Sequence, residues 1–70
     1  MMTNNIKVLR AIKNISQEEL AKKIQVSRQT INAMEKGKYV PSTLLALKLA
    51  QFFETQVEDI FTLSEEDKNI

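Results

Sequence analysis

Residues 16–37 read SQEELAKKIQVSRQTINAMEKG and carry the signals of two short helices joined by a tight turn. Ser16 and Glu19 form a capping box, in which each side chain accepts a hydrogen bond from the backbone N–H of the other residue. The first helix is therefore expected to begin at Gln17. Its inner face is predicted at the apolar positions that recur at helical spacing: Leu20, Ala21 and Ile24.

A second helix is expected almost immediately after the first. Only two residues, Gln25 and Val26, separate the first helix from Ser27. Serine is a preferred N-cap, so the second helix is expected over residues 28–36, and Gly37 follows it as a helix stop. So short a link makes two helices cross steeply. Helix-turn-helix DNA readers are built this way, with the second helix in the major groove.

The second helix has an outer face suited to DNA. A helical wheel places Ile31, Met34 and Glu35 on one side. The other side carries mostly polar or basic groups: Arg28, Gln29, Thr30, Asn32, Ala33 and Lys36. Arginine suits guanine, asparagine and glutamine suit adenine, and an alanine methyl group suits thymine. No acid occurs on this face between residues 27 and 39, although an ordinary solvated helix surface would also be polar.

Periodicity predicts two further helices. One is expected over residues 5–13, with Thr3 or Asn4 as its cap. Its apolar positions recur at helical spacing: Ile6, Leu9 and Ile12. The other is capped by Ser42 and expected over residues 43–54, and one more apolar turn follows at Val57, Ile60 and Phe61. No strand pattern is long enough for a sheet.

The expected fold is therefore all-α, a compact bundle of four to five short helices with a helix-turn-helix at about 17–36. Seventy residues hold one domain. Residues 1–63 are assigned to this DNA-binding domain and residues 64–70 to an acidic, loosely held C-terminal tail.

The composition excludes several kinds of site. The chain has no cysteine and no histidine, which excludes a disulfide framework, a thiolate or imidazole metal site, and catalysis by either residue. Gly37 is its only glycine, so a glycine-rich phosphate loop is absent. We expect no enzyme activity, no cofactor and no metal. No apolar run approaches the roughly 20 residues of a membrane span, and the first five residues are too polar for a signal peptide, so a cytoplasmic protein is expected.

Charge is distributed unevenly along the chain. Residues 1–48 hold nine bases and three acids, a net charge of +6, whereas residues 49–70 hold one base and six acids, a net charge of −5. This pattern is typical of a protein that presents one face to a polyanion and keeps the other away from it. The alternative is that these charges only solvate the surfaces of helices.

Several segments together resemble the Cro/CI-type helix-turn-helix family of phage repressors and small bacterial regulators. The similar runs are SQEELA at 16–21, VSRQTIN at 26–32, EKGKY at 35–39, PS at 41–42 and VEDIF at 57–61. The similarity extends from about Ile6 to Phe61 and is closest to compact single-domain members. It implies a lambda repressor-like fold and a transcriptional repressor that binds double-stranded DNA.

The resemblance also assigns roles to individual residues. Gln17 matches the position whose amide and helix dipole hold a DNA phosphate. Arg10 and Glu35 match an internal ion pair between the first helix and the recognition helix. Further DNA contacts are implied on the recognition helix and in the loop after it: Ser27, Arg28, Gln29, Asn32, Ala33, Lys36, Lys38, Tyr39 and Ser42.

Two positions depart from the family pattern. Relatives often have glycine in place of Gln25, because the turn favours a left-handed backbone, and a side chain there costs roughly 1 kcal/mol. Relatives often have an apolar residue in place of Thr43, so the start of the helix over residues 43–54 is expected to be less buried.

Residues 44–53, LLALKLAQFF, are more apolar than one packed helix needs. We expect Leu47, Ala50 and Phe53 to lie in the core. The remaining apolar residues favour a partner surface, because small monomers rarely expose large apolar patches. They are Leu44, Leu45, Phe52, Phe61 and Leu63.

The expected partner is a second copy of the chain. The predicted contact of this homodimer includes Phe52, Phe61 and Leu63, and a two-fold dimer reads a palindromic operator. A membrane-binding segment is disfavoured by the acids that follow: Glu54, Glu58 and Asp59. The alternative function is an antitoxin-like or protein-interaction regulator that binds a second protein as well as DNA.

Overall fold

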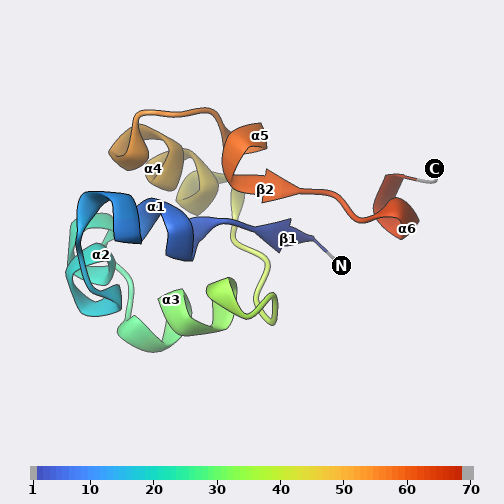
Figure 1. Cartoon of the computed structure of the whole chain (residues 1–70). Helices are drawn as coiled ribbons and strands as arrows, with labels where there is room; N and C mark the ends of the chain where they lie inside the picture. The colour runs from blue at the N-terminus through green and yellow to red at the C-terminus, as the bar shows by residue number, and fades with distance from the viewer. Residues whose placement is uncertain (1, 69–70) are drawn as a thin grey trace.

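Serine caps begin the three central helices of the protein, which a computed structural model describes for residues 2–68 (Figure 1). These helices are α2 (Gln17–Ile24), α3 (Arg28–Glu35) and α4 (Thr43–Phe53). The Oγ of each preceding serine accepts a hydrogen bond from the backbone N–H three residues later, at 3.0 or 3.1 Å. Glu19 Oε1 also accepts from the N–H of Ser16 at 2.9 Å, which confirms the predicted capping box.

The other elements are shorter or lie near the ends of the chain. They are α1 (Ile6–Lys13), α5 (Val57–Ile60), α6 (Glu65–Lys68) and the two-residue strands β1 (Thr3–Asn4) and β2 (Phe61–Thr62). The expected helical fold is confirmed, and the bounds of α1, α3 and α4 lie within one residue of those predicted. Among residues 2–68, no helix is long and apolar enough to cross a membrane, and no group of three or more Asp, Glu, His or Cys could hold a metal ion.

One core joins the helices. Within residues 2–68 its buried apolar members are Ile6, Leu20, Ala21, Ile24, Ile31, Met34, Leu45, Leu49, Ala50, Phe53 and Ile60. Ile12 recurs at helical spacing with Ile6 on α1 but does not join the core, since its side chain is 74% exposed. Each step of three residues turns a helical side chain by about 60°, so Ile12 points about 120° away from Ile6. On α4 the prediction is reversed for two residues, because Leu45 is buried and Leu47 is 55% exposed.

A short strand pair joins the two ends of the domain, contrary to the expectation of no sheet. Thr3 pairs with Thr62 and Asn4 with Phe61 in antiparallel register (Figure 1). Two residues per strand are too few to form an alternating pattern, so periodicity misses them. The N-cap of α1 is Asn5, not Thr3 or Asn4 as predicted, and its side chain makes no capping hydrogen bond. Asn4 Oδ1 accepts a hydrogen bond from the N–H of Ile6 at 3.1 Å.

A helical turn occupies part of the segment expected to be a loose tail. In α6, the backbone N–H of Asp67 donates to Ser64 Oγ at 3.2 Å, which is the geometry of a helix cap. Figure 1 shows that α6 stands apart from the bundle at the end of an extended segment. Residues 69–70 of the expected tail lie outside the described residues.

Candidate nucleic-acid interface

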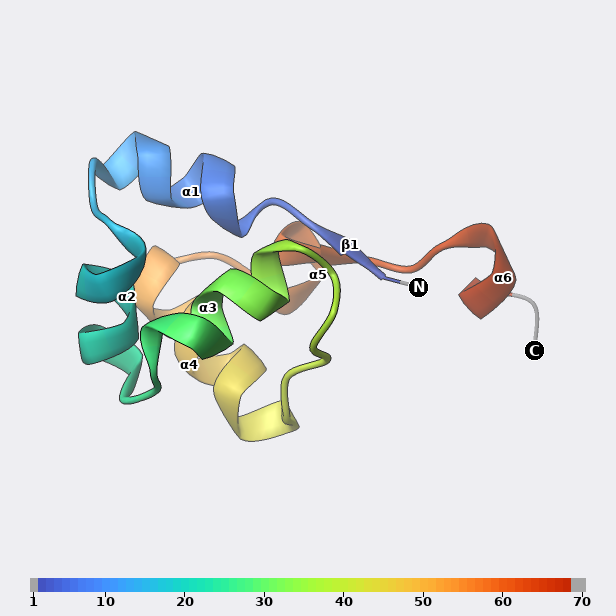
Figure 2. The ribbon, with the colours of Figure 1, turned by 90° about the horizontal axis from the view of Figure 1, so that it is seen from below.

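Helix α3 lies at the surface with one side anchored in the core. Ile31 and Met34 are 0% and 1% exposed, and these two anchors fix the rotation of the helix about its axis. Figure 2 shows α3 across the near side of the molecule, with α2 beside its start and the loop to α4 leading from its end. The opposite side of α3 therefore faces outward.

The turn between α2 and α3 sets the angle between these helices. Gln25 ends α2 in the left-handed region, at φ 64° and ψ 46°, so the unfavourable backbone expected at this non-glycine residue is confirmed. Its Oε1 accepts a hydrogen bond from Lys48 Nζ at 3.2 Å. Val26 is half-buried and packs against the core. Both residues of the turn thus have partners in the bundle.

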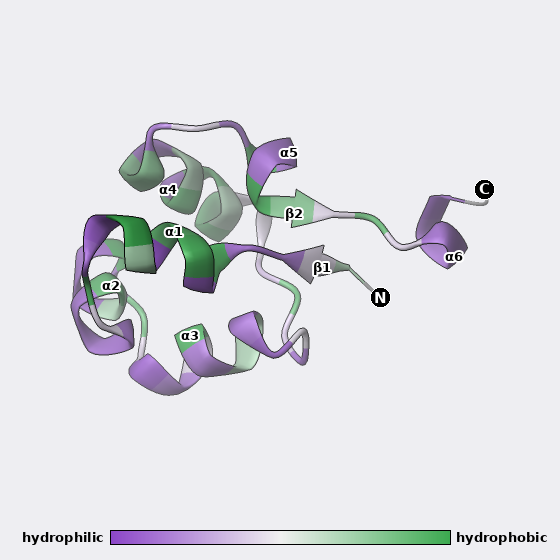
Figure 3. Cartoon of the chain, viewed as in Figure 1, coloured by the Kyte–Doolittle hydropathy of each residue, from purple (hydrophilic) through white to green (hydrophobic). Residues whose placement is uncertain are grey.

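An open hollow on the outer side of α3 gathers six of the predicted DNA contacts. Its lining residues are Arg28, Gln29, Asn32, Ala33, Lys36 and Lys38. Three of these side chains are cationic and none is anionic, so the hollow attracts a polyanion. Figure 3 shows the contrast between α3, which is mostly hydrophilic, and α4, which is mostly hydrophobic and lies above α3 in this view.

Three of the predicted contacts carry hydroxyl groups that already have partners. Ser27 Oγ accepts from the backbone N–H of Thr30 at 3.1 Å and lies 2.9 Å from Thr30 Oγ1 in a second hydrogen bond. Ser42 Oγ accepts from the N–H of Leu45 at 3.1 Å. These hydroxyls therefore hold the starts of α3 and α4 in place, and Thr30 is in addition half-buried.

Arg10 and Glu35 form an ion pair between α1 and α3. Arg10 Nε donates to Glu35 Oε2 at 2.5 Å and Nη2 donates to Oε1 at 3.1 Å, with the two side chains 14% and 8% exposed. Arg10 Nη1 also donates to the carbonyl of Ile15 at 3.0 Å. Burial alone would raise the pKa of Glu35, but hydrogen bonds from Arg10 and Gln17 outweigh burial and hold that pKa below its ordinary value.

Gln17 has an internal role that the sequence did not reveal. Its Nε2 donates to Glu35 Oε1 at 3.1 Å, and its Oε1 accepts from Asn32 Nδ2 at 3.4 Å. A second hollow lies at this junction, and Lys7 of α1 lines it although it was not predicted as a site residue. The lining residues are Lys7, Arg10, Gln17, Asn32, Glu35 and Lys36.

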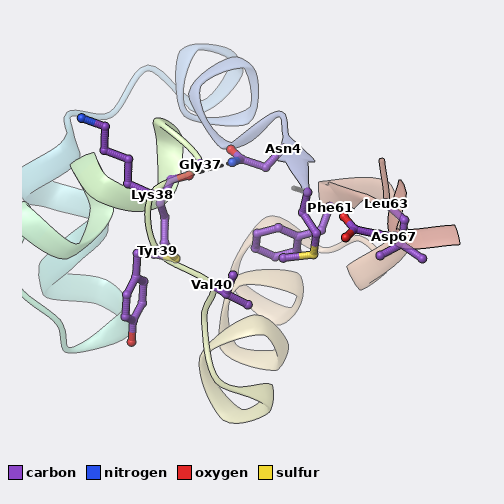
Figure 4. A pocket seen from close by; sticks show the side chains of 10 residues that line it. Asn4, Gly37, Lys38, Tyr39, Val40, Phe61, Leu63 and Asp67 are labelled. Carbon is purple, nitrogen blue, oxygen red and sulfur yellow. Dashed lines mark hydrogen bonds between the residues drawn. The ribbon is translucent and has the colours of Figure 1, made fainter. Parts of the chain in front are cut away.

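The loop after α3 is tied to the first strand. Gly37 takes a positive φ of 73°, and its N–H donates to the carbonyl of Met34 at 2.9 Å. Asn4 Nδ2 donates to the same carbonyl at 2.8 Å. From this fixed point Lys38 and Tyr39 project in opposite directions, as Figure 4 shows. Both are exposed, so the structure leaves their side chains accessible to a ligand.

The residues predicted for a dimer contact fall in two places. Phe61 and Leu63 line a hollow beside the loop after α3, together with Val40 (Figure 4). Phe52 lies near the other end of α4, where the Lys13 ammonium is 5.2 Å from the centre of its ring. It lines a different hollow, so the structure does not bring Phe52 together with Phe61 and Leu63.

Known proteins are similar to this chain in sequence over nearly its whole length. The family described as helix-turn-helix matches residues 6–60. The chain is 54% identical over 66 residues to an uncharacterized HTH-type transcriptional regulator of Methanocaldococcus jannaschii, covering 94% of this chain and 100% of the relative. It is 52% identical over 66 residues to the uncharacterized HTH-type transcriptional regulator YgzD of Bacillus subtilis, again covering 94% of this chain and 100% of the relative.

A phage protein is among the more distant relatives. The cryptic phage CTXphi transcriptional repressor RstR of Vibrio cholerae is 34% identical over 65 residues, which cover 93% of this chain and 59% of that protein. The family match extends over nearly the same residues as the similarity from about Ile6 to Phe61 that the sequence motifs predict. The chain therefore belongs to the Cro/CI-type helix-turn-helix family.

Proposed function

We propose that this protein is a sequence-specific DNA-binding transcriptional regulator that places α3 in the major groove. The observation that carries the proposal is the acid-free hollow on α3, where cationic, amide and methyl groups face outward from a helix with buried anchors. These groups match the edges that bases present in the major groove. Lys38 and the other cations near the hollow supply contacts to phosphates.

Repression is the proposed outcome of this binding. The relative from Vibrio cholerae is named as a transcriptional repressor, and others are named as transcriptional regulators. A protein bound to its operator excludes other proteins from that DNA, so repression requires no further activity. Because these relatives come from archaea and bacteria, whose DNA lies in the cytoplasm, the proposed site of action is the cytoplasm.

We propose that the working species is a homodimer that binds an inverted-repeat operator. One helix-turn-helix contacts too little DNA for high specificity, whereas two copies read half-sites about 34–36 Å apart. The hollow beside Phe61 and Leu63 supports this proposal, because large apolar side chains remain exposed around it. They include Tyr39 at 44%, Val40 at 69% and Leu63 at 50% exposed.

Selection of bound sequences from a random pool of double-stranded DNA tests the proposal. The expected result is one enriched motif with two-fold symmetry and half-sites one helical turn apart. A pool that stays random after repeated rounds at about 0.15 M salt would contradict sequence-specific binding. A motif without symmetry would retain sequence-specific binding and contradict the dimer.

A further inference from the structure

A chain of hydrogen bonds leads from the Arg10–Glu35 ion pair to the outer side of α3. Glu35 Oε1 accepts from Gln17 Nε2 at 3.1 Å, and Gln17 Oε1 accepts from Asn32 Nδ2 at 3.4 Å. The chain connects α1, α2 and α3 through side chains alone. Asn32 is its last member and also lines the hollow proposed to meet DNA.

The carboxylate of Glu35 fixes the orientation of the amide groups of Gln17 and Asn32. An ionised carboxylate only accepts hydrogen bonds, so Gln17 must turn its NH₂ group toward Glu35. The carbonyl oxygen of Gln17 then faces Asn32, which must in turn present its own NH₂ group. Turning either amide around would bring two oxygens or two NH₂ groups together, and the ion pair with Arg10 keeps Glu35 charged.

We propose that Gln17 is a positioning residue that fixes the orientation of Asn32, so that Asn32 selects adenine. One N–H of Asn32 is used by Gln17, which leaves the Oδ1 acceptor and one N–H donor for a base. Adenine offers the matching N6–H donor and N7 acceptor, whereas guanine offers two acceptors at this edge. The inference rests on the proposed function, because it names the base that one residue of the same DNA-binding surface reads.

This positioning role is separable from a phosphate contact. A phosphate contact by Gln17 would contribute equally to every DNA sequence, and its loss would weaken all complexes alike. A positioning role instead changes the preference for adenine over guanine at the base pair that Asn32 contacts. The ratio of two affinities measured on two operators therefore distinguishes the roles, whatever happens to overall affinity.

The test uses the full chain and the operator obtained by selection with the wild-type protein. Asn32→Ala first identifies the base pair at which adenine preference disappears. Gln17→Met keeps an unbranched side chain but removes both hydrogen bonds, so Asn32 is free to turn its NH₂ group toward guanine. We expect Gln17→Met to lower the adenine preference at that base pair by at least about fivefold. The double variant should show no further loss of preference beyond Asn32→Ala.

Two further variants complete the test. Gln17→Ala also removes both hydrogen bonds, with a shorter side chain, so it should lower the adenine preference as Gln17→Met does. Gln51→Met is the matched control, because Gln51 is exposed on α4 outside the proposed DNA-binding surface, and it should leave the preference at the Asn32 base pair unchanged. In the free protein, the NMR signals of the Asn32 side-chain amide should shift in Gln17→Met and show that the chain of hydrogen bonds exists before DNA binds.

The possible negative results contradict different proposals. A wild-type protein that selects no sequence would contradict the proposed function and this inference with it. A clear operator whose adenine preference is unchanged in Gln17→Met or in Gln17→Ala would contradict the positioning role alone. If Gln17→Met unfolds, the Gln17→Ala measurement decides the question by itself.

Discussion

Arg28 and Lys38 border the same hollow on α3 but offer different chemistry to DNA. The planar guanidinium of Arg28 can form two parallel hydrogen bonds with guanine O6 and N7. The ammonium group of Lys38 is a compact point charge on a flexible stem, and the loop that carries it lies beyond the end of α3. A base-reading role therefore suits Arg28, and a phosphate-binding role suits Lys38.

Alanine substitutions at these two residues should have different effects. Arg28→Ala should cost about 1–3 kcal/mol on the best operator and relax specificity at one base pair. Lys38→Ala should weaken binding to all sequences alike and lower the salt slope by about 1. Titrations of operator variants at several salt concentrations measure both effects. Equal loss on every sequence for Arg28→Ala would contradict base reading by this residue.

The Arg10–Glu35 pair should matter for stability rather than for direct contact with DNA. Both partners are largely buried, so Glu35→Gln leaves the Arg10 charge without its partner. The expected cost is about 3 kcal/mol in the free energy of unfolding, near the low end of the range for buried pairs because Arg10 keeps some solvent contact. Urea unfolding measures it. An unchanged stability with reduced DNA affinity would assign Glu35 to binding instead.

The same pair predicts how stability depends on pH. The folded-state pKa of Glu35 lies below its ordinary value of 4.5, so its contribution is present above about pH 4.5 and is lost as pH falls through the lowered pKa. Stability curves of the wild type and Glu35→Gln should differ at pH 7 and converge in acid. Parallel curves from pH 7 to pH 3 would contradict this contribution.

The sequence predicted those features of the site whose residues lie close together along the chain. The capping box of Ser16 and Glu19 spans four residues, so its pattern was visible in the sequence. The amide link from Gln17 to Asn32 brings together residues of α2 and α3 with Glu35 as a third partner. A contact between residues of different helices has no characteristic spacing in the sequence, so no sequence pattern predicts it.

Three helices end in a non-glycine residue whose backbone conformation favours glycine. Asn14, Gln25 and Glu54 follow α1, α2 and α4 with φ values of 57°, 64° and 55°. Asparagine tolerates this region better than most residues. Glu54 combines an unfavourable backbone with a negative charge at the C-terminal end of a helix, where the helix dipole is also negative. It is therefore the cap with the most to gain from substitution.

Glu54→Gly should stabilise the protein by about 0.5–1 kcal/mol, because glycine adopts a positive φ without steric cost. The free energy of unfolding from urea titration measures the change. Glu54→Ala is the matched control, since it removes the charge but keeps the Cβ atom. A glycine variant no more stable than the alanine variant would show that charge, and not backbone strain, accounts for the effect.

The helix boundaries were easier to predict than the inner faces of the helices. Serine caps and the Gly37 stop mark boundaries with single residues, and these positions were correct to within one residue. In α4 the sequence is apolar almost all round, so periodicity could not choose between Leu45 and Leu47 as the buried residue. The strand pair was missed because two residues per strand form no alternating pattern and because its partners, such as Asn4 and Phe61, lie at opposite ends of the domain sequence.

The whole molecule separates its basic surface from its acidic end. The basic residues of the first 48 positions lie on the bundle that carries α3, whereas the acidic α6 stands apart at one end of a molecule 36 Å long (Figure 1). The hollow that contains Phe61 and Leu63 lies next to α6 and beside the loop that follows α3. We propose this hollow as the contact between the two copies of the homodimer.

Leu63→Glu should produce monomers that keep the helical fold and bind the operator far more weakly, because a charge in an apolar contact loses its hydration. Phe61→Glu is a second variant with the same expected result. Ile12→Glu is the matched control, since Ile12 is 74% exposed on α1, away from this hollow. Sedimentation at micromolar concentration, with circular dichroism to confirm folding, measures the change. A wild-type protein that sediments as a monomer and binds one chain per operator would contradict the dimer.

The most direct test of sequence-specific DNA binding compares the affinity of the wild-type protein for its selected operator with that for a shuffled duplex of identical composition. The two titrations are made at the same salt concentration, about 0.15 M, because phosphate contacts alone give salt-dependent binding to any DNA. A regulator that reads bases through α3 should bind the operator at least about a thousandfold more tightly than the shuffled duplex. Equal affinity for the two duplexes would contradict base reading and leave only a protein that binds DNA by charge.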